Sequence, residues 1–405
     1  MKNVNSGALK NEIMNLDLYL KPVDFSKFKQ APWKQKKFSF VTLLEKNREK
    51  IPLEKAKIVL LGVEEDRNAV VRGSCGAPDK IREYLYGLNR IAPRFKILDI
   101  GNLIAGKTVN DTYFALRDVC RELVSHGIAV VVMGGSQDLT FGITKAFEET
   151  DFRLINIDPK LDLRKGAKTI DSEDYLSFVF GKHMNLFSQA TLGYQNYFTD
   201  SLDIGYASEF DAEVKRLGQL RYNMSEIEPY MRDADILSFD LNAVRQVEAP
   251  GQYFASPNGL YAEEACQVAH YAGMGDKVRV AGFFNLIPSL DQGDLSSKLM
   301  AQIVWHFLEG FSGRTIEDPT EDTGEFSRFI IEMEDIGLPL MFYQSHKTGR
   351  WWMNISDTSG LEERIVPCTQ ADYDMAARSE IPDRWWRSVR RMDRLFVREG
   401  NNSGN

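Results

Sequence analysis

The stretch Arg153–Asp162, RLINIDPKLD, decides the fold of this chain because it joins a strand candidate directly to two carboxylates. The mostly apolar start of the stretch lacks regular alternation, which is typical of a strand buried on both faces of a parallel sheet. Asp158 and Asp162 follow at its end. The same arrangement recurs where Gly134–Asp138 follows an apolar run. Open α/β sheets bind their ligands beyond the carboxyl ends of the strands, so these junctions predict a site at that edge.

Short apolar runs alternate with helical patterns from about residue 57 to residue 311. Such strand–helix alternation predicts an α/β protein with a doubly wound, mainly parallel sheet. The predicted strands are Lys57–Val63, Phe95–Gly101, Ile128–Met133, Arg153–Asp158, Ala234–Asp240 and Val278–Asn285. The predicted helices are Ala77–Leu88, Asp111–Ser125 and Ala262–Tyr271.

The chain of 405 residues is longer than one compact domain usually is, and its character changes after about Phe311. We expect an N-terminal segment at 1–50, the α/β domain at 51–312, a small mixed α+β extension at 313–398 and a flexible tail at 399–405. The extension is predicted to hold strands at Phe329–Glu334, Leu338–Ser345 and Arg350–Ile355, and helices at Ala371–Ser379 and Asp383–Arg398.

Composition narrows the class of protein. The net charge of −8 argues against a general role in binding nucleic acid. The four cysteines are scattered without a CxxC pair, which is typical of reduced thiols. The N-terminus lacks the apolar core of a secretory signal, and no apolar run reaches the roughly 20 residues of a membrane span. A cytoplasmic protein without a membrane segment is therefore expected.

The last predicted helix, DRWWRSVRRMDRLFVR at Asp383–Arg398, combines arginines with a possible apolar stripe. Its stripe would consist of Trp385, Trp386, Val389, Met392, Leu395 and Phe396. We interpret this helix as one that docks on the main domain or on another subunit. A protein partner bound through its arginines and tryptophans is the alternative, because both residue types are favoured at interfaces.

Five segments in chain order carry motifs at predicted strand ends. They are Gly73–Leu85; Gly134–Asp138 (GGSQD); Asp158–Asp162 (DPKLD); Ser238–Arg245 (SFDLNAVR), with APG following; and Asn285–Pro288 (NLIP). They match the small-residue loop, GGDH, DAHxD, SFDxDxxDP and ExNP signatures, so residues 57–310 resemble the ureohydrolase family of arginase, agmatinase and formimidoylglutamase. Segment Ala255–Ala265 looks most like a formimidoylglutamase. The resemblance implies a three-layer αβα fold and a homo-oligomer.

The resemblance also implies a site for two Mn²⁺ ions, but several ligand positions hold other residue types. The departures are Gln137, Lys160 and Asn242. At most one divalent cation (Mn²⁺, Mg²⁺ or Ca²⁺) is expected, because a charged lysine cannot ligate a metal. Its ligands would be Gln137, Asp158, Asp162 and Asp240. The alternative is a metal-free site in which Lys160 and Arg245 form salt bridges with the aspartates.

These departures leave two functions open. The first is a binding or scaffold protein without standard amidinohydrolase activity. The second is a formimidoylglutamase-like hydrolase of formimidoyl or guanidino C–N bonds. The catalytic candidates are Asp158, Lys160 and Asp240, and the substrate-side candidates are Asn242, Arg245 and Asn285. Asp138 is expected to cap a helix or to substitute as a ligand. The five histidines, His126, His183, His270, His306 and His346, are expected to be structural or surface residues.

Overall fold

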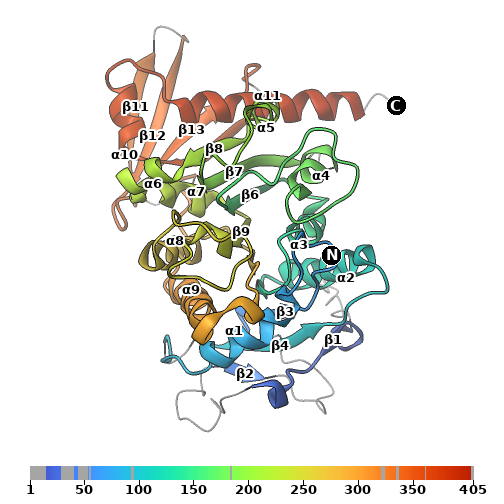
Figure 1. Ribbon diagram of the computed structural model, residues 1–405. Helices are drawn as coiled ribbons and strands as arrows, with labels where there is room; N and C mark the ends of the chain where they lie inside the picture. The colour runs from blue at the N-terminus through green and yellow to red at the C-terminus, as the bar shows by residue number, and fades with distance from the viewer. Residues whose placement is uncertain are drawn as a thin grey trace, which may run out of the picture.

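A ten-stranded sheet runs through the body of the chain in this computed structural model, which describes residues 15–28, 41–43, 53, 56–92, 95–182, 185–320, 324–333, 337–360 and 362–402 (Figure 1). Its strands are β1 (Leu20–Lys21), β2 (Val41–Leu43), β3 (Ile58–Val63), β4 (Ile97–Leu103), β5 (Ala129–Met133), β6 (Phe152–Ile157), β7 (Leu186–Tyr194), β8 (Glu213–Arg216), β9 (Ile236–Asp240) and β10 (Val280–Phe284). Their order is β1-β4-β3-β5-β10-β9-β6-β7-β8, with β2 on β4. Only the β1–β4 pairing is antiparallel among these described strands, so the mainly parallel sheet is confirmed.

Helices cover both faces of this sheet and make the three-layer αβα arrangement (Figure 1). One face packs against α1 (Ala77–Leu85), α7 (Ile227–Asp233), α8 (Ala262–Met274) and α9 (Leu295–Ser312). The other packs against α2 (Val109–Ser125), α3 (Leu139–Thr144) and α4 (Tyr175–Lys182). Neighbouring residues of β5 point to opposite layers, since Val131 joins the first core and Val130 the second. Continuous apolar strands are therefore the expected sequence pattern.

The predictions missed the strands at the β7–β8 end of the sheet. Both carry polar side chains, such as Gln189 in β7 and Lys215 in β8. Short helices α5 (Ser201–Ser208) and α6 (Leu217–Tyr222) flank β8. This end of the sheet is partly covered by the extension, so its strands lack the continuous apolar run on which the predictions depended.

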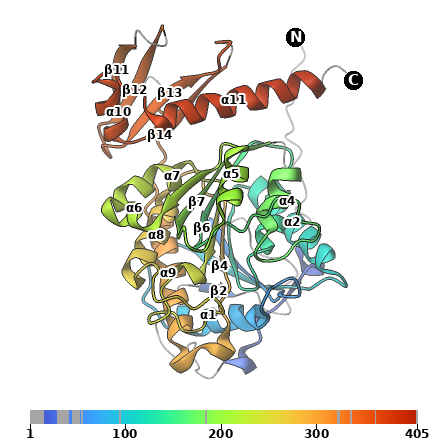
Figure 2. The same ribbon diagram turned by 45° about the horizontal axis from the view of Figure 1, so that its top comes forward.

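The extension forms a second, antiparallel sheet with two helices. Its strands are β11 (Phe326–Met333), β12 (Leu338–Ser345), β13 (Trp351–Ser356) and β14 (Glu363–Cys368), followed by α10 (Gln370–Ala376) and α11 (Asp383–Asn402). The three predicted strands and both helices are present, and β14 was missed. Figure 2 shows α11 lying across the top of the body. Helix α11 continues past the predicted end at Arg398, and residues 403–405 lie outside the described residues.

The extension is anchored to the body by buried arginines. Arg391 of α11 pairs with Glu213 of β8 at 2.8 Å. Arg232 of α7 is fully buried and donates to the Trp351 carbonyl oxygen at 2.9 Å. Trp385 joins the extension's core, whereas Trp386 remains 44% exposed. Helix α11 therefore docks on the body through part of the predicted stripe, and the side chains of its last residues lie outside the described part of the chain.

Candidate functional site

The regular geometry of the parallel sheet brings the predicted site residues together at one edge. Strands β5, β10, β9 and β6 are neighbours, so their carboxyl ends lie side by side. Gln137 follows β5, Asn285 follows β10, Asp240 ends β9 and Asp158 follows β6. All four side chains are buried, and so is Asp162, which lies close enough to Asp158 for that carboxylate, after burial, to raise its pKa. The structure therefore brings the predicted residues together at the edge of the sheet where the sequence placed them.

Local turns hold two of the aspartates in place. Asp158 Oδ1 accepts a hydrogen bond from the Lys160 backbone N–H at 2.9 Å. Asp240 Oδ1 accepts from the Asn242 backbone N–H at 2.8 Å, and its Oδ2 accepts from Asn242 Nδ2 at 3.0 Å. These are the turns in which an Asp side chain bonds the backbone two residues on. The turns leave the remaining oxygen atoms of the cluster facing inward.

Three buried oxygens at this edge receive no hydrogen bond from the described residues. They are Gln137 Oε1, Asp158 Oδ2 and Asp162 Oδ1. Burial, together with the mutual repulsion of the aspartates, raises the pKa of Asp158 and of Asp162 far above the ordinary range. Burial also raises the pKa of Asp240. Clustered carboxylates that lack donors are costly unless a cation is present.

Lys160 does not neutralise the aspartates by direct contact. Its Nζ pairs with Glu173 and lies 4.4 Å from the ring centre of Phe254. Burial lowers the pKa of Lys160, but Asp162 and Glu173 raise it by more, so the side chain is charged. Tyr253 donates to the same Glu173 carboxylate at 3.1 Å. The expected salt bridge from Lys160 to the aspartates is thus replaced by one to Glu173.

Arg245 was also expected to pair with the aspartates, and this expectation is wrong. Its Nε donates to Glu248 Oε1 at 2.6 Å, and its guanidinium lies 4.2 Å from the ring centre of Tyr261. Glu248 is three residues along the chain, so the pair forms within one turn of the backbone. Arg245 is therefore occupied outside the cluster.

The donor set fits one hard cation. Gln137, Asp158, Asp162 and Asp240 offer only oxygen ligands, which suit Mn²⁺, Mg²⁺ or Ca²⁺. Of the positions where the resemblance implies ligands for a second ion, Lys160 has a charged ammonium with no acceptor. Asn242 offers its Oδ1, which also accepts from the Phe254 backbone N–H at 3.2 Å.

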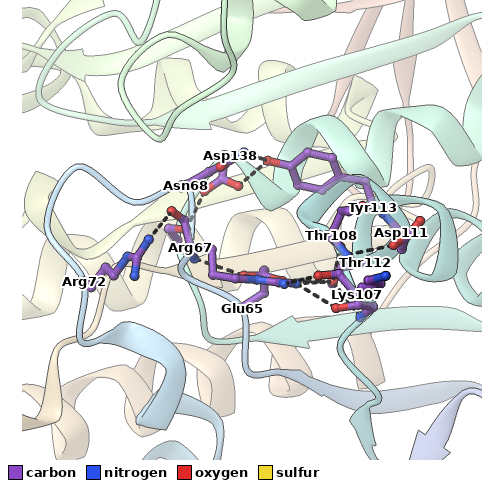
Figure 3. A network of polar contacts seen from close by, with 12 residues as sticks. Glu65, Arg67, Asn68, Arg72, Lys107, Thr108, Asp111, Thr112, Tyr113 and Asp138 are labelled. Atoms are coloured by element: carbon purple, nitrogen blue, oxygen red, sulfur yellow. Dashed lines mark hydrogen bonds and ion pairs between the residues drawn. The ribbon is translucent and has the colours of Figure 1, made fainter.

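Asp138 belongs to a structural network rather than to the metal cluster (Figure 3). It accepts from Tyr113 Oη at 2.5 Å, and Ser136 Oγ also donates to it. Its side chain makes no capping bond to α3, so the predicted cap is wrong. Burial raises the pKa of Asp138 to about 6. Its carboxylate oxygens are thus already bound by hydroxyl groups and are not available as ligands.

The same network fixes the loop after β3 against the start of α2 (Figure 3). Arg67 Nε donates to Glu65 at 2.9 Å, and the Thr112 hydroxyl donates to Glu65 at 2.9 Å. The Glu65 carbonyl oxygen accepts from the Ser136 N–H at 3.1 Å, next to Gln137. The loop therefore supports the turn that carries a candidate ligand.

Sequence reasoning missed Glu173, Tyr253 and Phe254 beside the cluster. Glu173 lies in the loop that follows Asp158–Asp162 and precedes α4. Tyr253 and Phe254 follow the APG segment and carry no metal-ligand chemistry. Their proximity to Lys160 depends on loop packing, which residue spacing does not reveal. His183 lies outside the described residues.

The parallel sheet and the acidic cluster at its carboxyl edge define a ureohydrolase-type α/β protein. Residues 56–309 match the arginase family, and the chain belongs to this family. The formimidoylglutamase of Salmonella arizonae is 21% identical over 248 residues, which cover 59% of this chain and 79% of that protein. The formimidoylglutamase of Salmonella heidelberg is 32% identical over 118 residues, 27% of this chain and 38% of that protein.

Solved structures share the fold of the body. The Trypanosoma cruzi formiminoglutamase with Mn²⁺ is 21% identical, with a TM-score of 0.60 over 66% of this chain and 97% of that one. The Bacillus subtilis formimidoylglutamase is 17% identical, with a TM-score of 0.62 over 70% of this chain and 93% of that one. The arginase-like fold is thus confirmed, and the family match ends before the extension.

Proposed function

We propose that the protein is a formimidoylglutamase-like hydrolase of linear amidine C–N bonds that uses one divalent cation. The observation that carries this proposal is the convergence of three buried oxygens without donors, Gln137 Oε1, Asp158 Oδ2 and Asp162 Oδ1. A buried polar group without a partner is costly, and it marks a binding site when several converge. The similarity to formimidoylglutamases supports the substrate class.

The charges of the site also favour a cation. Because Lys160 is paired with Glu173, its charge is offset there, and the three aspartates remain without an equal positive charge. A divalent ion held by Gln137, Asp158, Asp162 and Asp240 would offset most of the negative charge of these aspartates. Such an ion would lower the pKa of a water molecule and polarise the amidine carbon–nitrogen bond.

The residues beside the cluster would bind and orient the substrate. Glu173 and Tyr253 place a carboxylate and a hydroxyl next to the Lys160 ammonium, so this group can both donate and accept a proton at the departing amine. Asn242 is fixed by Asp240, and Asn285 accepts from the Gln137 N–H at 3.2 Å. These amides form a rigid wall on the substrate side.

The test combines metal analysis with product analysis. The purified chain is incubated with Mn²⁺, its metal content is measured by mass spectrometry, and it is assayed with N-formimidoyl-glutamate, agmatine and arginine. We expect about one ion per chain and release of formamide from the formimidoyl substrate. Asp240→Ala should lose the bound ion and the release of formamide. Asp151→Ala removes a carboxylate that pairs with Arg364 at the extension, and this variant should keep the ion and the activity. Metal-free protein that stays inactive with Mn²⁺ would refute the proposal.

A second function is favoured by a specific observation, the loss of the second cation's ligands at Lys160 and Asn242. In this proposal the protein binds a ligand or partner without amidinohydrolase turnover. It predicts one bound ion and no product from any of the three substrates. Assembly as a homo-oligomer and capture of a protein partner through α11 are further proposals, which size-exclusion chromatography with light scattering and deletion of α11 would test. None of the described helices is long and apolar enough to cross a membrane.

A further inference from the structure

Two helices on the other side of the molecule bring together a second set of metal-ligating groups. His270 lies on α8, and His306 and Glu309 lie on α9. One ligand atom from each side chain lies within 4.8 Å of the others. Glu309 Oε2 is 3.3 Å from His270 Nδ1 and 3.5 Å from His306 Nδ1. The cluster shares no residue with the acidic edge of the sheet.

The two helices hold this cluster rigidly because their backbones touch. A Cβ atom added at Gly310 would lie 2.3 Å from the His270 carbonyl oxygen, and one added at Gly273 would lie 2.1 Å from the Phe307 carbonyl oxygen. Helices α8 and α9 lie side by side in both views (Figures 1 and 2). Only glycine permits so close a crossing. The ligand positions are therefore fixed by core packing, as preorganised metal sites require.

Two of the three separations within the cluster match a tetrahedral ion. Zinc bonds of about 2.0–2.1 Å to nitrogen and oxygen hold tetrahedral ligand atoms about 3.3–3.4 Å apart. The separations from Glu309 Oε2 to the two imidazoles are 3.3 and 3.5 Å. The two imidazoles are farther apart, with ring centres at 6.5 Å, so their side chains must turn toward each other when an ion binds. Two histidines and one carboxylate, with the fourth position open to water, form a common zinc ligand set. From this geometry we propose that His270, His306 and Glu309 form a Zn²⁺ site between α8 and α9.

A pair of ordinary ion pairs explains the cluster less well. The Nδ1 atom of His270 is buried and makes no hydrogen bond with the described residues, although Glu309 lies next to it. The same carboxylate oxygen, Glu309 Oε2, is the atom nearest to both imidazoles. A metal ion would satisfy all three groups at once. The side chains of His270, His306 and Glu309 are 33%, 38% and 41% exposed, so an ion can enter from solvent.

The ligand chemistry separates this site from the acidic one. Imidazole nitrogen favours Zn²⁺ over Mn²⁺, following the general order of affinities for first-row divalent metals. The acidic edge offers oxygen atoms only and suits Mn²⁺ or Mg²⁺. Zinc bound between the helices would link α8 to α9 and stabilise the folded chain. The two helices that the ion would link belong to the core on one face of the sheet.

The experiment uses the full chain with Asp158→Asn, which removes binding at the acidic edge. Isothermal titration with Zn²⁺ and visible spectra with Co²⁺ report the remaining site. We expect one ion per chain, tetrahedral Co²⁺ bands, and a thermal midpoint raised by about 3–8 °C at saturating zinc. Glu309→Gln, which keeps the shape of the side chain, and His306→Ala should each weaken zinc binding at least tenfold.

The matched control is His126→Ala, which removes a histidine paired with Glu122 at the end of α2 and should leave zinc binding unchanged. Zinc titrations that are the same before and after both Glu309→Gln and His306→Ala would overturn the proposal. So would Co²⁺ spectra typical of octahedral oxygen ligands. Neither outcome bears on formamide release, so this inference and the proposed hydrolase activity fail separately.

Discussion

Replacing Asp158 by Asn should stabilise the metal-free protein and abolish its response to Mn²⁺. The substitution keeps the shape of the side chain, and the Asn oxygen can still accept from the Lys160 backbone N–H. It removes a buried ionisable group that folding forces to take up a proton beside Asp162 and Asp240. Functional sites often hold such unfavourable charges in readiness for a ligand, at a cost in stability.

The magnitude follows from the pKa of the buried carboxyl group. Burial and the charge of Asp240 raise the pKa of Asp158 from 3.8 to about 8. The folded chain then binds a proton that the unfolded chain has lost, so stability falls as pH rises from about 4 to about 8. At pH 7 the ceiling on this cost is about 4 kcal/mol. Since the site can relax and admit water, we expect Asp158→Asn to gain about 1–3 kcal/mol.

The assay is urea unfolding of metal-stripped protein at pH 5 and pH 7, with and without Mn²⁺. Wild type should be less stable at pH 7 than at pH 5 when stripped, and Mn²⁺ at a hundred times its dissociation constant should restore about 2.7 kcal/mol. Asp158→Asn should show no response to Mn²⁺ and a smaller loss of stability between pH 5 and pH 7, because burial still raises the pKa of Asp162 and of Asp240. If the metal-stripped Asp158→Asn variant is less stable at pH 7 than the metal-stripped wild type, the reasoning is refuted.

Asp291→Asn is the matched control for the same chemical change. Asp291 is also buried, but its carboxylate accepts from the Ser296 N–H at 2.8 Å and from the Ser297 N–H at 2.8 Å. Here the negative charge is well bonded at the start of α9. Its replacement should therefore destabilise the chain by about 1–2 kcal/mol, with or without Mn²⁺.

Three further predictions concern the rest of the chain. Burial raises the pKa of Glu213, but Arg391, Arg384 and Tyr230 together outweigh it and hold the pKa at about 2. Glu213→Gln should therefore cost about 3 kcal/mol in urea unfolding at pH 7, and the loss should shrink as pH falls from 4.5 to 2. An equal loss at all pH values would contradict this. Gly310→Ala should lower the thermal midpoint and weaken zinc binding, because its Cβ would meet the His270 carbonyl oxygen. Lys160→Met should tighten Mn²⁺ binding by roughly tenfold in titration calorimetry, since it removes a positive charge near the aspartates; unchanged affinity would show that Lys160 does not oppose the cation.

The sequence alone determined the sheet and the edge on which the acidic site lies. Apolar strands followed at once by Asp158 or Asp240 are local features, and the parallel sheet fixes where their ends meet. The residue types also predict that the Lys160 position holds no metal ligand, because a charged ammonium has no acceptor in any fold. The strands near the extension were missed because their polar side chains hide the periodicity.

Tertiary structure alone decided which charged groups pair. Lys160 pairs with Glu173 rather than with the aspartates, and this depends on how two loops pack over the strand ends. The histidines give the clearest case, since the sequence predicted structural roles for His270 and His306. Glu309 lies three residues after His306 on α9, but His270 meets both only through the glycine-mediated crossing of α8 and α9. Contacts between residues far apart in the chain are set by helix packing, and spacing along the sequence carries no record of that geometry.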